Sequence, residues 1–170
     1  MEKTAGQPRW VWLRMLGFTA LLPGLVMVYA PYWWIITPQP VASRWPPDAM
    51  HAPALLAMIA GSSIYAVCAW RFAVDGLGTP APWDPPRRLV TGGLYGWTRN
   101  PMYVGIVLAL LGEAWLFSSS AQLTFAMCMA MAFHRRVLLF GERVLRKLFG
   151  ADFGAEFEAY CARVRRWGVV

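Results

Sequence analysis

Long apolar runs alternate with short polar segments along this chain, and the runs predict its architecture. Four of them are long enough to cross a hydrocarbon core of about 30 Å, which takes roughly 20 helical residues. Because backbone groups in lipid must form their hydrogen bonds internally, each run is expected to be a helix. The sequence therefore predicts an all-α polytopic membrane protein with about four transmembrane helices, over about Met15–Ile36, Ala52–Ala73, Pro101–Phe117 and Ala121–Phe140.

The composition agrees with a membrane protein. Of the 170 residues, 58% are hydrophobic and 15% are charged, and the mean hydropathy is +0.40. These values are too apolar for an ordinary soluble domain. The first run follows Lys3, Arg9 and Arg14, but it is too long for a secretory signal and lacks a convincing cleavage site, so we interpret it as a retained span.

The positive charges predict the orientation. The N-terminal segment, residues 71–100 and the residues from 135 onward hold 3, 4 and 8 Lys or Arg, whereas the opposite face has only Arg44. By the positive-inside rule both termini are expected in the cytoplasm. Because these charges flank the spans, membrane lipids and not nucleic acid are the expected partners. No disulfide or metal site is expected, since Cys68, Cys128 and Cys161 are far apart and no histidine pair accompanies them.

The third run begins at an unusually polar motif, YGWTRNPMYVG, at positions 95–105. The preceding loop is rich in proline and glycine, which favours a fixed, turn-rich path and a functional role. Pro101 suits the first turn of a helix, and Asn100 suits the N-cap position before it. Further along, Gly105, Ala109 and Gly112 form a stripe of small residues. Such a stripe allows close helix contact, although Gly105 is equally suited to admitting a ligand.

The elements after the motif are expected to meet it again on the cytoplasmic face. The turn SSS at 118–120 is so short that runs three and four must form an antiparallel hairpin. Helical character continues past the fourth run, and the tail has apolar residues at helical spacing, which predicts a C-terminal amphipathic cytoplasmic helix. Residues 99–103 and 134–145 should therefore be neighbours. We expect a two-helix membrane hairpin over 1–74 and one integrated core over 75–170.

Two segments resemble signatures of a known superfamily. LYGWTRNPMYVG is similar to the pattern G-x-Y-R-x-x-R-[HN]-P-M-Y-x-G. GERVLRKLFGADFGAEFEAYCARVRRW is similar to E-E-x-x-L-x-x-x-F-G-x-x-Y-x-x-Y-x-x-x-V-P-R-W. Both patterns belong to the isoprenylcysteine carboxyl methyltransferase and phospholipid methyltransferase superfamily, and the loop before the motif looks like that of its small bacterial members. The resemblance covers about 76–167 and implies a location in the bacterial inner membrane.

The resemblance also implies an activity and a site. Members transfer a methyl group from S-adenosylmethionine to a lipophilic acceptor, leaving S-adenosylhomocysteine. Arg99 and Glu142 are the expected catalytic residues, and His134 is expected beside them as a contact or a base. Gly141 stands where the family has the first glutamate of a pair, and Arg165 stands where it usually has proline. The cofactor would be bound by Tyr95, Arg99, Asn100, Pro101, Tyr103, Gly105, His134, Glu142 and Leu145.

The chemistry of these side chains suits that cofactor. A carboxylate at Glu142 can accept hydrogen bonds from ribose hydroxyls or the α-amino group. The aromatic faces of Tyr95 and Tyr103 can stabilise a sulfonium. The planar guanidinium of Arg99 suits the cofactor's carboxylate or an acidic acceptor.

Two other interpretations stay open. Related folds include NADPH-dependent sterol reductases, although this chain has no G-x-G-x-x-G motif and lacks the extra spans expected of them. The loss of a glutamate at Gly141 would also suit a non-catalytic lipid-binding scaffold. The sequence leaves the acceptor open among an isoprenylcysteine-like carboxylate, a phospholipid amine and a thiol, and it leaves the oligomeric state open.

Overall fold

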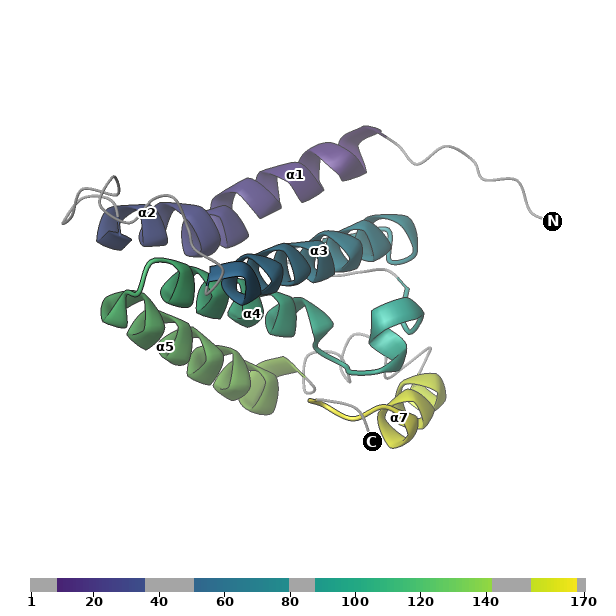
Figure 1. Cartoon of the computed structure of the whole chain (residues 1–170). Helices are drawn as coiled ribbons and strands as arrows, with labels where there is room; N and C mark the ends of the chain where they lie inside the picture. Colours follow the sequence, from purple (N-terminus) through teal and green to yellow (C-terminus); the bar gives the residue numbers. More distant parts are fainter. Residues whose placement is uncertain (1–8, 36–50, 80–87, 142–153, 168–170) are drawn as a thin grey trace.

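A computed structural model describes residues 9–35, 51–79, 88–141 and 154–167, and these residues are helical or in turns and loops, without strands (Figure 1). The N-terminal helix runs without a break through α1, η1 and α2, and begins at Arg9, earlier than the predicted Met15. Its middle is a π-helical segment directly after Pro23 and Gly24. The helices are α1 (Arg9–Gly24), η1 (Leu25–Tyr29), α2 (Ala30–Ile35), α3 (Ala52–Val74), η4 (Gly93–Gly96), α4 (Pro101–Leu116), α5 (Ser120–Arg136), η5 (Val137–Gly141) and α7 (Gly154–Arg163).

Two of these helices are long and apolar enough to cross a membrane. They cover Trp10–Trp33 and Ala52–Val74, and α4 is a shorter apolar helix. The predicted first two spans thus have matching helices by length and composition. The third and fourth spans stay predictions.

Helices α3 and α4 pack in backbone contact along their length (Figure 1). A Cβ atom at Gly61 would lie 2.5 Å from the carbonyl oxygen of Gly105 and 2.5 Å from the amide nitrogen of Ala109. A Cβ atom at Gly112 would lie 2.7 Å from the carbonyl oxygen of Ala54. The small-residue stripe expected in the sequence therefore serves close helix contact, and the helix that it contacts is α3.

Helices α4 and α5 form the expected antiparallel hairpin. The chain turns at Ser118, whose φ of 47° lies in the left-handed region. The side chain of Ser119 then caps α5 by accepting a hydrogen bond of 3.2 Å from the Gln122 amide. Just inside this turn, the Gln122 side-chain amide donates a 2.7 Å bond to the carboxyl group of Glu113, and both side chains are buried. This bond joins the two helices at the end opposite the signature motif.

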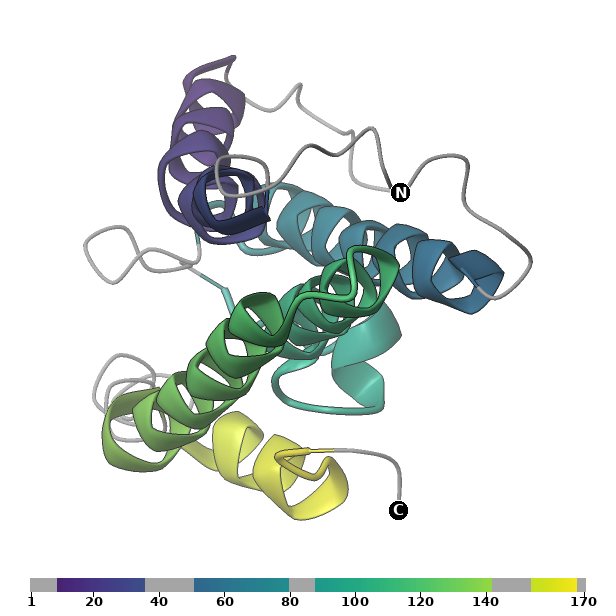
Figure 2. The same cartoon turned by 60° about the vertical axis from the view of Figure 1, so that its left-hand side comes forward.

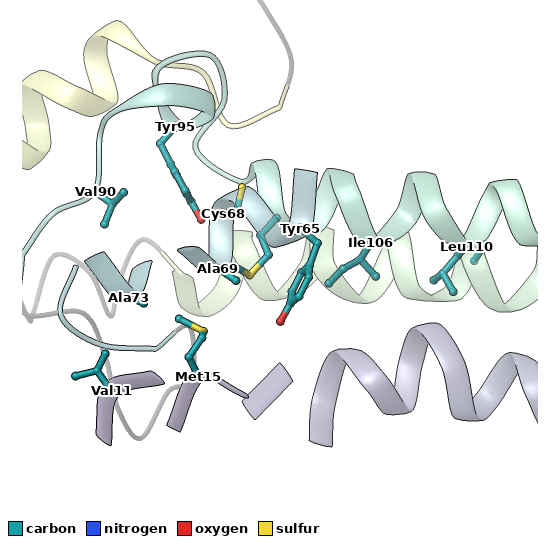
Figure 3. Packing of buried hydrophobic residues seen from close by; sticks show 12 residues of the cluster. Val11, Met15, Tyr65, Cys68, Ala69, Ala73, Val90, Tyr95, Ile106 and Leu110 are labelled. Carbon is teal, nitrogen blue, oxygen red and sulfur yellow. The ribbon is translucent and has the colours of Figure 1, made fainter. Parts of the chain in front are cut away.

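Helix α1 lies on the outer side of α3 and joins the same core. Val11 and Met15 are buried against the apolar face of α3 (Figure 3). The hydroxyl groups of Thr19 and Tyr65 are 2.8 Å apart. The core thus includes α1, α3 and α4 together, and the division at residue 74 stays a prediction.

The Gly61 contact gives a test of this packing. Gly61→Ala should lower the free energy of unfolding by about 1–3 kcal/mol, because the neighbouring atoms are backbone and cannot move without separating the helices. Thermal unfolding in detergent measures the effect. Gly17→Ala is the matched control, since a Cβ atom there meets nothing within 4 Å. Equal melting temperatures in the two variants would contradict the close contact.

Candidate functional site

One end of the helix bundle gathers the elements that carry both signatures. The end of α3, the start of α4, the end of α5 and helix α7 all lie at this end (Figures 1 and 2). They come from distant parts of the sequence, as hydrogen bonds between residues 98–100 and 165–166 show. The expected convergence of the motif, the end of the hairpin and the tail is therefore present.

The motif starts helix α4 as predicted but uses Asn100 differently. Pro101 is the first helical residue and is buried, and Asn100 occupies the N-cap position. The side chain of Asn100, however, makes no capping hydrogen bond. Its amide nitrogen instead donates a 3.1 Å bond to the carbonyl oxygen of Arg166. The expected cap is thus replaced by a tether to the tail.

Two more donors of the motif bind the same stretch of tail backbone. The Thr98 hydroxyl donates to the carbonyl oxygen of Arg166 at 2.9 Å. The backbone N–H of Arg99 donates to the carbonyl oxygen of Arg165, also at 2.9 Å. Three consecutive residues of the motif therefore bind two consecutive carbonyl groups of the tail.

Helix α7 docks through an apolar face. Phe157, Tyr160 and Val164 are buried in a small cluster that Leu89 and Cys161 complete. The hydroxyl group of Tyr160 donates a buried 2.8 Å bond to the carbonyl oxygen of Tyr95. The helix is thus fixed on the loop by apolar contact, and its register is set by one hydrogen bond.

The ring of Tyr95 points away from the tail and into the helical core. It lies 5.6 Å from the ring of Phe72, centroid to centroid, and its hydroxyl group approaches Cys68 (Figure 3). Burial raises the pKa of the Tyr95 hydroxyl, and the nearby Cys68 thiol raises it further. Gly105 likewise faces α3, because a Cβ there would lie 2.8 Å from the Gly61 carbonyl oxygen. Tyr95 and Gly105 therefore both pack against α3, and their contacts with a cofactor stay predictions.

The side chain of Arg99 points toward helix α7. Its terminal nitrogen lies 3.1 Å from the sulfur atom of Cys161. Cys161 and Thr98 both occupy variable positions of the two signatures, so the sequence had no signal that could have found them. Arg99 is thus held between the motif and the tail.

The end of α5 lies against the first turn of α4. Tyr103 stacks on Phe133 with ring centroids 4.4 Å apart and an interplanar angle of 12°. The Tyr103 hydroxyl accepts a 3.0 Å bond from Nε of Arg136. The predicted proximity of residues 99–103 to the end of the fourth run is confirmed as far as the chain is described. Glu142 and Leu145 lie outside the described residues.

The tail also places a donor near the only histidine on this side. The ring of His134 lies 6.0 Å from the ring of Trp167. Within the described part of the chain, the indole N–H of Trp167 is buried and has no acceptor. A buried donor of this kind suits a ligand with hydroxyl or carboxylate oxygens. No three possible metal ligands gather among the residues that the structure describes.

Comparison with known proteins gives one match. The sequence model of the phospholipid methyltransferase family matches residues 51–152, more than half of the 170-residue chain. The matched region begins at the start of α3 and includes the motif and the α4–α5 hairpin. Searches of curated proteins and of solved structures found no match.

The tail contacts can be tested at Thr98. Thr98→Val keeps the shape of the side chain and removes one donor to the Arg166 carbonyl, so the tail should detach more easily by about 1 kcal/mol. Hydrogen exchange of α7 amides measures this, and faster exchange is expected there. Thr124→Val is the matched control, because among the described residues its exposed hydroxyl bonds to the Ser120 carbonyl within α5 and to no part of the tail. Unchanged α7 exchange in Thr98→Val would contradict the tether.

A pH dependence follows from Tyr160. Burial raises the pKa of Tyr160 to about 12, above its ordinary value of about 10. The docked tail therefore holds this proton more tightly, so docking is fully stable below about pH 10 and weakens as the pH rises toward 12. The phenolate absorbance difference between wild type and Tyr160→Phe should titrate near pH 12. A step near pH 10 would show that Tyr160 is not buried.

Proposed function

Since the chain belongs to the phospholipid methyltransferase family, within the isoprenylcysteine carboxyl methyltransferase superfamily, we propose that it transfers a methyl group from S-adenosylmethionine to a lipophilic acceptor. The family establishes a membrane methyltransferase. The cofactor and the acceptor class are the proposed part. S-adenosylhomocysteine would be the product, and the acceptor would enter from the lipid.

The observation that carries the proposal is the pairing of the motif with the tail. Residues 98–100 hold the carbonyl groups of Arg165 and Arg166. This pairing brings Arg99 and Trp167 to the same end of the bundle as His134. Positive and neutral donors therefore lie at one end of the bundle, which suits a ligand with a carboxylate and hydroxyl groups.

The chain's own residues would bind and align the reactants. S-adenosylmethionine supplies an activated methyl group on a sulfonium, so alignment and exclusion of water provide most of the acceleration. The guanidinium group of Arg99 would hold a carboxylate, and the buried indole N–H of Trp167 would donate to an oxygen atom. The carboxylate of Glu142 is proposed to accept hydrogen bonds from the ribose or the α-amino group.

The tail has a second part in this proposal. Helix α7 covers residue 95 and its neighbours through Tyr160 and the apolar cluster around it. A covered site excludes water, which strengthens every electrostatic contact within it. Asn100 would then assist binding by holding the tail, since its amide is bonded to the Arg166 carbonyl. His134 is proposed as the base for an acceptor that arrives protonated.

The decisive experiment is a titration of S-adenosylmethionine and S-adenosylhomocysteine into the full chain in detergent. Saturable binding is expected, and Glu142→Gln should weaken it about 10- to 100-fold, because one charge-assisted hydrogen bond is lost. Isothermal calorimetry measures both. Glu156→Gln is the matched control, since Glu156 is an exposed carboxylate in the first turn of α7.

The outcomes separate the alternatives. Equal affinity in Glu142→Gln and wild type would refute the role of that carboxylate. If the folded wild-type protein binds neither compound, the proposed cofactor is wrong. NADPH is then the next ligand, and failure of NADPH as well would leave the scaffold interpretation.

A further inference from the structure

Arg136 differs from its neighbour Arg135 because a side chain of α4 fixes its guanidinium group. Its Nε donates a 3.0 Å bond to the Tyr103 hydroxyl, and the Tyr103 ring is stacked on Phe133. The side chain of the neighbouring Arg135 is also exposed, but it forms no hydrogen bond with another described residue. A basic residue that only reaches for the membrane surface needs no such partner.

The bond to Tyr103 uses Nε of Arg136 and does not involve the two terminal nitrogens of the guanidinium group. Nε is occupied, the side chain is exposed, and no described residue accepts a hydrogen bond from either terminal nitrogen of Arg136. Among the described residues, no carboxylate forms an ion pair with Arg136. A guanidinium group held in this way presents its planar fork to an anion with less entropy left to lose.

The surroundings favour an anion as well. Arg136 ends α5 directly after His134 and Arg135, and a π-helical segment begins at Val137. π-Helical turns are frequent at functional sites. Helix α5 has no acidic residue, and the carboxylate of α4 is Glu113, at the opposite end of that helix. Among the described residues of α4 and α5, the charged side chains at this end of the hairpin are therefore all positive.

We propose that Tyr103 and Arg136 bind the phosphate group of a lipid at the cytoplasmic mouth and so position the acceptor. Bidentate contact between a guanidinium group and phosphate supplies both affinity and orientation. Tyr103 lies in the signature motif, which is part of the proposed site. This inference deepens the proposed function and rests on it for the identity of the bound lipid as acceptor, but the binding can be measured without any reaction.

The test compares three variants of the full chain in neutral detergent. The probe is dihexanoyl phosphatidylglycerol, followed by calorimetry, with dihexanoylglycerol as the same lipid without phosphate. Arg136→Gln should weaken binding of the phosphate lipid by about 10-fold or more, since a charge-assisted contact is lost. Tyr103→Phe should weaken it by a smaller factor, because the ring stays and only the hydroxyl is removed. Arg135→Gln should change it less than about twofold.

Each result decides the proposal. Equal losses in Arg135→Gln and Arg136→Gln would overturn it in favour of general surface charge. Equal binding of the lipid with and without phosphate would overturn it too. Competition by inorganic phosphate at the same concentration would show an ion site and exclude a lipid site.

A titration of S-adenosylmethionine into Arg136→Gln keeps the two proposals apart. Unchanged cofactor affinity with weakened lipid binding supports the positioning role. If the protein prefers the lipid with phosphate but binds no S-adenosylmethionine, the phosphate site stands and the proposed methyl donor is wrong. If it binds S-adenosylmethionine but does not distinguish the two lipids, the methyl donor stands and the phosphate site is wrong.

Discussion

Helices α3 and α4 approach so closely that a methyl group does not fit between them at three positions. These positions are Gly61, Gly105 and Gly112, and the atoms that face them are mostly backbone atoms. The short separation fixes the start of α4 relative to the end of α3, and the signature motif lies between these two points. The family match includes both helices of this pair, since it begins with α3 and leaves α1 outside. The α3–α4 pair is therefore the frame on which the site is built.

The site itself is assembled by weaker contacts of a different kind. Apolar burial brings α7 to the loop, and hydrogen bonds from residues 98–100 then fix the backbone of residues 165 and 166 after this helix. Single bonds of this sort contribute about 1 kcal/mol each. The tail can thus detach at a lower free energy than the frame unfolds, which would suit the proposed site, where a cofactor would enter from water and an acceptor from lipid.

Much of the fold was predictable because it depends on run length and on residues with strong local preferences. Pro101 marks the start of α4, and the short serine turn requires the hairpin. The partner of the small-residue stripe was not predictable, because periodicity identifies a face and not the helix that it meets. The hydrogen bond from Asn100 to the tail was not predictable either. Its acceptor is a backbone carbonyl, and every residue has one, so the sequence does not indicate which residue accepts the bond. Tyr95 matched a signature position, yet its ring is buried in the core.

The motif holds the tail through backbone carbonyl groups, and this affects which substitutions the tail can accept during evolution. The groups that the motif binds are the carbonyl oxygens of Arg165 and Arg166, and every amino acid, proline included, provides one. Arginine at position 165, where the family signature has proline, is therefore compatible with these contacts. Substitution at 165 therefore keeps the carbonyl group that the motif binds, so the inherited position of the backbone survives a change of side chain there.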